Sequence, residues 1–450
     1  MFPPNPPCRR LFHKGPGRRI GKFALWGRII GVLLPLLPVL LSGAESPPAL
    51  TLQEAQLEAF QHNWDQQSAR RDVDIADAQR AIAHEFPNPS LAYSTAKINT
   101  DGKTNATAAG NDLWDRSYDS ILAVTQPFEI GGKRSDRQAS ASAGYLAARA
   151  QFADAHRTLD VAVARAYVGA ALADASAKVT AESAGYLRTE ADVAAVRLKA
   201  GDIAQSDLDR IEIAARQMEL QAQNARAAAV SQRVALELLI GVDHPNGGVV
   251  IRDDLETLAD REAPPPPAHD VNRPDLAAAE QSLRKAEADL RLQRAMRIPD
   301  PSLLVQYERE PPDGPNTVGI GLSFPLPLWN RNQGAIHAAS LAREQAALAV
   351  AKVNAQVDAD IATARAGYDE ALARWHDYRN EVRPRATRVR ESVSLAYEKG
   401  GVSLVDLLEA QRDDSDVRLA AAQAAADAAA ARAALQAALT EFQPEPGDKP

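Results

Sequence analysis

Two acidic residues near the C-terminal end of the chain have the spacing that best suits a chemical role. Asp406 and Glu409 lie three positions apart in a helical pattern, so both carboxylates fall on one face of the predicted helix. Carboxylates on the wall of a narrow passage attract cations and repel anions. The alternative is that they are ordinary solvated helix charges, because Asp413, Asp414 and Asp416 follow closely.

The rest of the sequence has no pattern typical of a metal site or an enzyme. Its eight histidines are scattered without a pair at a spacing of three or four, and its one cysteine is Cys8, so we predict neither a high-affinity metal site nor a cofactor. Gly132-Lys133 is not a phosphate-binding loop, because Pro127 stands where its first glycine is needed and Arg134 replaces the Ser or Thr. No nucleophile or acid–base constellation is evident, so we do not expect an enzyme.

The elements that must position the two carboxylates are indicated by the stretch Asn316–Gly334, where a strand pattern gives way to a helix pattern. Apolar residues occupy every second position before two prolines, which predicts a strand with one apolar face. Pro325 and Pro327 end the strand because proline has no N–H to donate. From Asn332 to Gly400 the pattern is helical, and about 65 residues at 1.5 Å each make a rod of roughly 100 Å.

The same junction occurs earlier in the chain, which is therefore a tandem repeat. Gln126–Arg134 leads from a strand into another long helix, and Phe86–Leu91 is echoed by Ile298–Leu303. We predict five divisions: a signal peptide (1–44), a first repeat of helix, β-hairpin, long helix, helix and linker strand (45–262), a Pro-rich linker (263–272), a second repeat (273–442) and a disordered tail (443–450).

The periodicity of apolar residues predicts the elements within each repeat. In the first repeat we expect a helix over 52–85, strands over 89–96 and 118–126, and helices over 135–200 and up to about 240. In the second we expect a helix ending at 298, strands over 302–308 and 317–324, a helix over 332–400 kinked at Pro384, and a helix over 403–442. Thr51 and Glu54 predict a capping box at the first helix. Aromatic residues make up only 5% of the chain, which favours helix packing through small side chains.

The N-terminal residues predict export from the cytoplasm. A basic region is followed by an apolar run, Phe23–Leu41, and by the small residues Ser42-Gly43-Ala44, which is typical of a secretory signal peptide cut near Ala44. An uncleaved membrane anchor is the alternative, because the apolar run is nearly long enough to span a bilayer. Cys8 precedes the cut, so the mature chain has no cysteine, which suits the periplasm. The net charge of −8 indicates no nucleic-acid partner.

Four candidate membrane strands in one chain are too few to cross a membrane alone. An open sheet with unpaired edges cannot sit in lipid, and outer-membrane barrels begin at about eight strands. Two, three or four copies of the chain could therefore share one barrel, with cyclic symmetry. The Ala-rich helices must likewise pack into a bundle or tube.

The two junctions also resemble those of a known family. Gln126–Arg134 and Pro325–Gly334, together with Tyr397–Gly400 and Val405–Ala410, are similar to TolC-like outer-membrane efflux factors, and the junction motifs to the heavy-metal (CzcC-like) branch. The resemblance covers essentially the whole mature chain. It implies a mainly α fold in which long coiled-coil helices form an α-barrel and four strands per protomer contribute to a trimeric 12-stranded β-barrel in outer-membrane lipid. It also implies a passive duct for heavy-metal cations, and two partners, a periplasmic adaptor protein and an inner-membrane RND-type pump.

The resemblance implies roles for residues at the periplasmic tip of the helices. Asp406, Glu409 and Asp207 match the family's gate, and trimer symmetry would stack their carboxylates into acidic rings. Residues that match the family's adaptor-docking region are Gly201, Ser206, Tyr397, Gly400, Gly401 and Ser403. Plain helix capping is the alternative role for these residues. The family often has an arginine where this chain has Val402, so a closed state would need other contacts, such as Lys199 or Lys399 with Asp207 or Asp406.

Three other functions remain open from the sequence. One is a duct for drugs and other organic solutes or for type I secretion. Another is a periplasmic coiled-coil scaffold without a channel, which the two alternating hairpins disfavour. The last is a secreted enzyme, for which no catalytic constellation is evident.

Overall fold

The computed structural model describes residues 49–98, 117–265, 271–310 and 314–443, all within one compact unit, Pro47–Pro450. Several sequence predictions concern segments outside the described residues. These are the signal peptide, most of the first hairpin loop (99–116), part of the Pro-rich linker (266–270), the tip of the second hairpin (311–313) and the tail from 444 onward.

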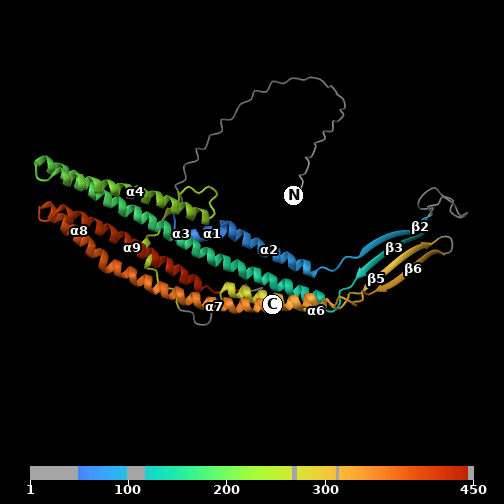
Figure 1. Cartoon of the computed structure of the whole chain (residues 1–450). Helices are drawn as coiled ribbons and strands as arrows, with labels where there is room; N and C mark the ends of the chain where they lie inside the picture. Colours follow the sequence, from blue (N-terminus) through green and yellow to red (C-terminus); the bar gives the residue numbers. More distant parts are fainter. Residues whose placement is uncertain (1–48, 99–116, 266–270, 311–313, 444–450) are drawn as a thin grey trace, which may run out of the picture. The chain divides into compact units, whose positions relative to one another are not determined.

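Long helices make up most of this unit (Figure 1). The first repeat contains α1 (Leu52–His62), α2 (Trp64–His84), α3 (Lys133–Ala200) and α4 (Gln205–Leu239). The second contains α6 (Pro274–Ala295), α7 (Gln333–Asp377), α8 (Arg383–Glu398) and α9 (Leu404–Ala438). With 68 residues, α3 is roughly 100 Å long, and it covers the helix predicted over 135–200. Among the described helices, none is long and apolar enough to cross a membrane.

The single helix predicted over 52–85 was wrong, because the chain breaks at Asn63. This residue has extended backbone angles and ends α1, and its side chain caps α2 by accepting from Gln66 N. The same side chain donates a 2.9 Å hydrogen bond to Leu239 O at the end of α4. The break therefore fixes α1 and α2 to the end of the α3–α4 hairpin. The capping box of Thr51 and Glu54 is confirmed.

The predicted kink at Pro384 takes the form of a π-helical turn, η1 (Tyr378–Val382), between α7 and α8. Pro384 lies in the first turn of α8, where its missing N–H weakens the regular α-helical bonding of the preceding turn. A wider turn relieves that conflict, and such turns are frequent at functional positions.

The four longer strands form one antiparallel sheet in the order β2 (Ser90–Ile98), β3 (Ser117–Pro127), β5 (Ser302–Glu310), β6 (Gly314–Ser323). One row across the sheet is Leu91, Val124, Val305 and Ile320, and the neighbouring row is Ala92, Ala123, Gln306 and Gly319. The first row is largely exposed and belongs to a continuous apolar face, whereas the second belongs to a face of small and polar residues. Strands β2 and β6 form the two edges of the sheet.

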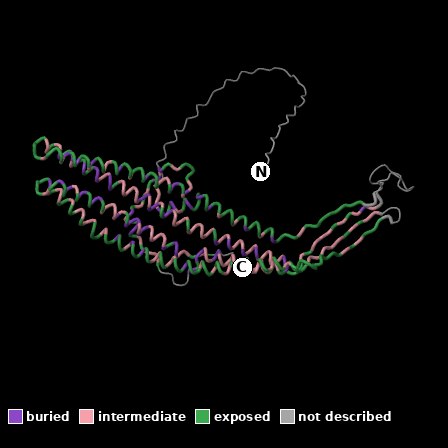
Figure 2. The backbone as a smooth tube through the Cα atoms, in the orientation of Figure 1, coloured by how far each residue is buried: buried purple, intermediate pink, exposed green. Residues whose placement is uncertain are grey.

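The core is a narrow band along the helices (Figure 2). More than half of its buried apolar side chains are alanines, and most of these alanines lie on α3 and α9. This agrees with the low aromatic content, and small side chains allow the helix backbones to approach closely. The fully buried larger side chains include Tyr167, Leu236 and Trp375, which belong to one apolar cluster.

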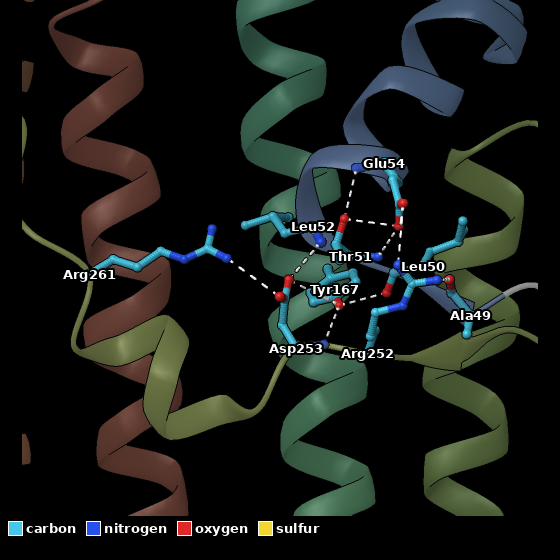
Figure 3. A network of polar contacts seen from close by, with 9 residues as sticks. All are labelled: Ala49, Leu50, Thr51, Leu52, Glu54, Tyr167, Arg252, Asp253 and Arg261. Atoms are coloured by element: carbon cyan, nitrogen blue, oxygen red, sulfur yellow. Dashed lines mark hydrogen bonds and ion pairs between the residues drawn. The ribbon is translucent and has the colours of Figure 1, made fainter.

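A short parallel pair of strands, β1 (Ala49–Leu50) and β4 (Val250–Ile251), joins the start of the described chain to the end of the first repeat. Tyr167 on α3 lies at the centre of this joint (Figure 3). Its hydroxyl donates to Leu50 O at 2.8 Å and accepts from Asp253 N at 3.1 Å, while Leu52 N donates to the Asp253 carboxylate at 2.8 Å. Burial raises the pKa of Tyr167 to about 12, so its hydroxyl stays protonated as a donor.

Candidate functional site at the helix tips

The turns that close the two long helical hairpins each use a left-handed glycine. Gly201 follows α3 with φ 84°, and Gly400 follows α8 with φ 73°. A Cβ at either position would have no heavy atom within 4 Å, so glycine is needed there for its backbone conformation and not for space. Both turns lie where the sequence predicts that the long helices end.

The two tips pack against each other through one apolar cluster. It joins α3, α4, α8 and α9, and its buried members are Ala191, Ala194, Leu208, Ile211, Tyr397, Leu404 and Leu407. Val402 packs against this cluster. The Arg197 guanidinium lies 5.3 Å from the centre of the Tyr397 ring, a cation–π contact. Tyr397, predicted at the docking region, is thus a buried residue that holds the tips together.

Asp406 is a capping residue. Its carboxylate accepts from Ser403 N at 3.0 Å and from Ser403 Oγ at 2.8 Å, while Ser403 Oγ accepts from Asp406 N. This reciprocal capping box begins α9. The two bonds from Ser403 hold the pKa of Asp406 below its ordinary value, so the exposed carboxylate is negatively charged at neutral pH.

Glu409 lies one turn further along α9 and is also exposed, whereas Leu407 and Ala410 are buried. The structure thus places Asp406 and Glu409 on one solvent-facing side of the helix. Asp207 is half-buried in the first turn of α4, and Ser206 beside it is exposed. Gly401 and Ser403 are exposed at the second tip.

The alternative tip contacts proposed from the sequence are absent from this single chain. Among the described side chains, no ion pair links Lys199 or Lys399 to Asp207 or Asp406. Asp406 is bonded to Ser403 instead, and apolar packing brings the tips together.

The sequence missed a set of polar contacts between α3 and the α8–α9 hairpin. Glu182 pairs with Arg418, Ser183 lies 3.3 Å from Ser415 between their hydroxyls, and Ser394 donates to Glu190 at 3.4 Å. Polar residues recurring at helical spacing on α3 were the signal that could have found them. Burial and the nearby Glu398 raise the pKa of Glu190.

Asp414 was wrongly interpreted as a solvated charge, because its side chain is buried. It is 4% exposed and lies 3.3 Å from Arg390 Nε, and Thr387 donates to it at 3.1 Å. It therefore links α9 to α8 from inside the hairpin.

A groove of about 480 Å³ runs between α8 and α9 above the tip. Its lining includes the apolar residues Val389, Ala410 and Val417 and the charged residues Arg385 and Asp413. An apolar groove with charged sides suits an amphipathic helix.

The described residues also bear on metal binding. Among them, no group of three or more His, Cys, Asp or Glu side chains is placed to hold a metal ion.

Comparison with known proteins gives a consistent result. The sequence model of the outer membrane efflux protein family matches residues 57–242 and 269–441. The chain is 25% identical over 378 residues to the cobalt-zinc-cadmium resistance protein CzcC of Cupriavidus metallidurans, with 84% of this chain and 86% of that protein covered. It is 27% identical over 341 residues to the nickel and cobalt resistance protein CnrC of the same species, with 75% and 78% covered.

Solved structures share the fold. A crystal structure of CusC superposes with a TM-score of 0.72 at 17% identity, covering 87% of this chain and 92% of that one. The open-state MtrE outer membrane channel of Neisseria gonorrhoeae gives 0.68 at 22% identity, with 86% and 88% covered.

Proposed function

This chain belongs to the outer membrane efflux protein family, the family of TolC-like channels, and from that premise we propose that it is the exit duct through which an efflux system releases heavy-metal cations. As a member of the family it is an outer-membrane efflux channel that extends into the periplasm, and it is not an enzyme. The cargo is the proposed part. The observation that carries it is the similarity, over most of both chains, to a cobalt-zinc-cadmium resistance protein.

The surface chemistry of the tip agrees with a cationic cargo. Asp406 and Glu409 present two exposed carboxylates on one side of α9, and channels of this family are trimers. Threefold symmetry turns the two side chains into two acidic rings, with Asp207 of α4 on the neighbouring tip. Such rings concentrate cations at a constriction without binding them tightly, as a duct requires.

Gating in this proposal is a movement of the tips. The resting trimer holds the turns at Gly201 and Gly400 together, so the acidic rings narrow the passage. Docking of a periplasmic adaptor then moves the helical hairpins apart. The docking surface comprises Gly201, Ser206, Gly400, Gly401 and Ser403, with Tyr397 fixing the tip beneath them, and the groove between α8 and α9 suits a helix of the adaptor. An inner-membrane RND-type pump supplies the energy.

The test is metal susceptibility in a strain that lacks only this chain. Zn, Co, Cd, Ni, Cu and Ag salts are compared with dyes and antibiotics, and the wild-type chain on a plasmid is the control. Hypersensitivity to one or a few metals, reversed by the plasmid, is the expected result. Hypersensitivity to organic compounds alone would reject the metal cargo and favour an organic-solute duct.

A further inference from the structure

Inside the chain, the turn that leaves the first pair of strands rests on the turn that leads into the second pair. We call residues 127–132 the first outgoing turn and residues 298–301 the second incoming turn. Phe128 N donates to Pro301 O at 2.9 Å, and Ile130 N donates to Asp300 Oδ1 at 3.0 Å. Lys133 forms a 2.7 Å ion pair with the same carboxylate and is almost fully buried.

The corresponding turn of each repeat, which has no such partner within the described chain, is more exposed. In the second outgoing turn, residues 324–331, Leu326 and Leu328 are 73% and 61% exposed, against 48% and 40% for Phe128 and Ile130 at the matching positions, and Trp329 is 91% exposed. In the first incoming turn, residues 86–89, Asn88 and Pro89 are exposed. These residues echo Asp300 and Pro301, which are half-buried. A large exposed aliphatic and aromatic segment marks an interaction surface.

The topology of the sheet shows where the two exposed turns meet. Within the chain, β3 pairs with β5 and the register ends at Pro127 and Ser302, which places the first outgoing turn beside the second incoming turn. Strands β6 and β2 are the free edges. Because β6 ends at Ser323 and β2 begins at Ser90, an antiparallel pairing of β6 with β2 of the next copy places their turns side by side in the same way.

We propose that the second outgoing turn of each copy docks on the first incoming turn of the next copy, repeating between subunits the contact seen inside the chain. Leu326 N–H then donates to Pro89 O of the partner subunit, as Phe128 does to Pro301. Leu328 N–H donates to Leu326 O at 2.9 Å within the chain. On docking it exchanges that bond for one to the side chain of Asn88 of the partner subunit, as Ile130 bonds to Asp300. The inference rests on the proposed function, because it needs a sheet closed from several copies.

The polar residues at the two contacts correspond. Lys133 is the first residue of α3, and Gln333 is the first residue of α7. The ion pair of Lys133 with Asp300 inside the chain is thus replaced between copies by two neutral amides, those of Gln333 and Asn88. Neutral amides can be buried at less cost than charges when the subunits assemble.

The second outgoing turn is longer than the first, and its extra residues include Trp329. A cavity of about 450 Å³ lies at the first incoming turn, lined by Phe86, Pro87, Pro89, Pro127, Phe128 and Arg134 among others. The Arg134 guanidinium already lies 4.1 Å from the centre of the Phe86 ring, so its outer face can stack on an indole. Trp329 of one copy therefore enters this cavity of the partner subunit, as an aromatic anchor of the kind that dominates interfaces.

Disulfide trapping tests the docking. The chain has no cysteine after Cys8, so the pair Asn88→Cys and Leu328→Cys can be oxidised in intact cells without interference. We expect reducible species up to the mass of a trimer, and none from either single variant. The matched control is Thr125→Cys with Leu304→Cys, which are register partners within the chain and should give a disulfide at monomer mass.

The outcomes separate this inference from the proposed function. An amine-reactive cross-linker measures the trimer independently. If it captures trimers while the Asn88 and Leu328 cysteines stay unlinked, the docking of the turns is wrong but the duct stands. If no trimer is captured, both fail.

A second measurement concerns the anchor and the amide pair. Trp329→Ala should speed dissociation of the detergent-solubilised trimer by on the order of tenfold or more, whereas Trp64→Ala should not. Asn88→Asp combined with Gln333→Lys would recreate between copies the ion pair that Lys133 and Asp300 form inside the chain. The trimer of the double variant should therefore be more heat-stable than the sum of the two single effects predicts. The contact would be overturned if the effects of Asn88→Asp and Gln333→Lys on heat stability were strictly additive. It would also be overturned if Trp329→Ala left the dissociation rate unchanged and brominated lipid quenched the fluorescence of Trp329, which would place the indole in lipid.

Discussion

The indole Nε1 of Trp375 donates a 3.0 Å hydrogen bond to Oδ1 of Asp260, which ties the second long helix to the last residues of the first repeat. Arg379 pairs with the other oxygen of Asp260, and Arg383 pairs with Glu256 on α5 (Leu255–Ala259). The three donors follow one another at helical spacing across the π-helical turn. This clamp fixes the position from which α8 descends to the tip.

Removing the donor of the clamp should destabilise the fold. Trp375 is completely buried, so Trp375→Phe loses one hydrogen bond to a charged group and should lower the free energy of unfolding by about 1–3 kcal/mol. Trp375→Ala also leaves a cavity and should cost about 3–5 kcal/mol. Urea unfolding followed by circular dichroism measures both. The control is Trp64→Phe at a half-exposed tryptophan; equal effects of the two Phe variants would refute the clamp.

Glu237 should make folding depend on pH. Its carboxylate accepts from the backbone N–H groups of Asn246, Gly247 and Val249 at 2.6, 2.7 and 2.8 Å. Burial acts to raise the pKa of Glu237, but these donors outweigh it and hold the pKa below its ordinary value. The contribution to stability is therefore complete above the unfolded-state pKa of about 4.3 and is lost as the pH falls through the lower folded-state pKa.

Glu237→Gln should cost about 1.5–3 kcal/mol at pH 7. The gap to wild type should narrow in acid, where the wild-type carboxylate is protonated. Chemical unfolding at a series of pH values measures both the cost at pH 7 and the change of the gap with pH. Glu212→Gln, at an exposed position of the same helix, serves as the control. A gap that stays constant below pH 4 would argue against the role of the charge.

The acidic tip residues should control conductance through their charge. Because Asp406 caps α9, Asp406→Ala would change both charge and helix end, whereas Asp406→Asn keeps an oxygen for Ser403. Asp406→Asn with Glu409→Gln should lower the selectivity of the channel for cations over anions in planar bilayers and weaken its block by multivalent cations, because the rings then no longer concentrate cations. Ser403→Ala breaks the cap and keeps both charges, so it should leave the block intact. If Ser403→Ala reproduces the effect, the cap and not the charge is responsible.

Glu190 should make the contact between α3 and α8 stronger in mild acid. Its pKa is raised by burial and by Glu398, against the smaller opposing effects of Ser394 and Arg197. The folded chain therefore binds a proton more tightly than the unfolded chain does. The free energy of unfolding should therefore increase as the pH falls from above the raised folded-state pKa of Glu190 towards the ordinary pKa of a glutamate. It should decrease again as the pH rises.

Thermal unfolding between pH 5 and pH 7.5 tests this dependence. Glu190→Gln should flatten it and raise stability at pH 7. Glu182→Gln, on the same helix, removes an ion pair with Arg418 and should lower stability without flattening the pH dependence. A Glu190→Gln curve parallel to wild type would contradict the assignment.

Much of the fold could be predicted because it depends on local patterns. Alternating residues before Pro325 predict the strand, and Gly201 and Gly400 predict the turns of the tips. The break at Asn63 could not be predicted, because it is stabilised by Leu239, which is distant in sequence. The same applies to Asp414, whose partners lie on another helix: an acidic residue among acidic residues gives no sign that it is buried.

The candidate site was predicted less completely than the fold. The shared exposed face of Asp406 and Glu409 follows from their spacing, and the structure has it. The role of Asp406 in capping follows from Ser403 three positions earlier, which the sequence contains. The packing of Tyr397 and Val402 depends on two hairpins meeting, and helical periodicity alone does not show which hairpins meet.

The most direct test of the heavy-metal duct is the rate at which preloaded cells lose metal. Cells lacking this chain, and the same cells carrying it on a plasmid, are loaded with Zn, Co or Cd and transferred to metal-free medium, and cell-associated metal is followed by mass spectrometry. The duct predicts slow loss of at least one metal without the chain and fast loss with it, at unchanged uptake. Equal rates for every metal, with dye efflux restored by the plasmid, would contradict a metal cargo.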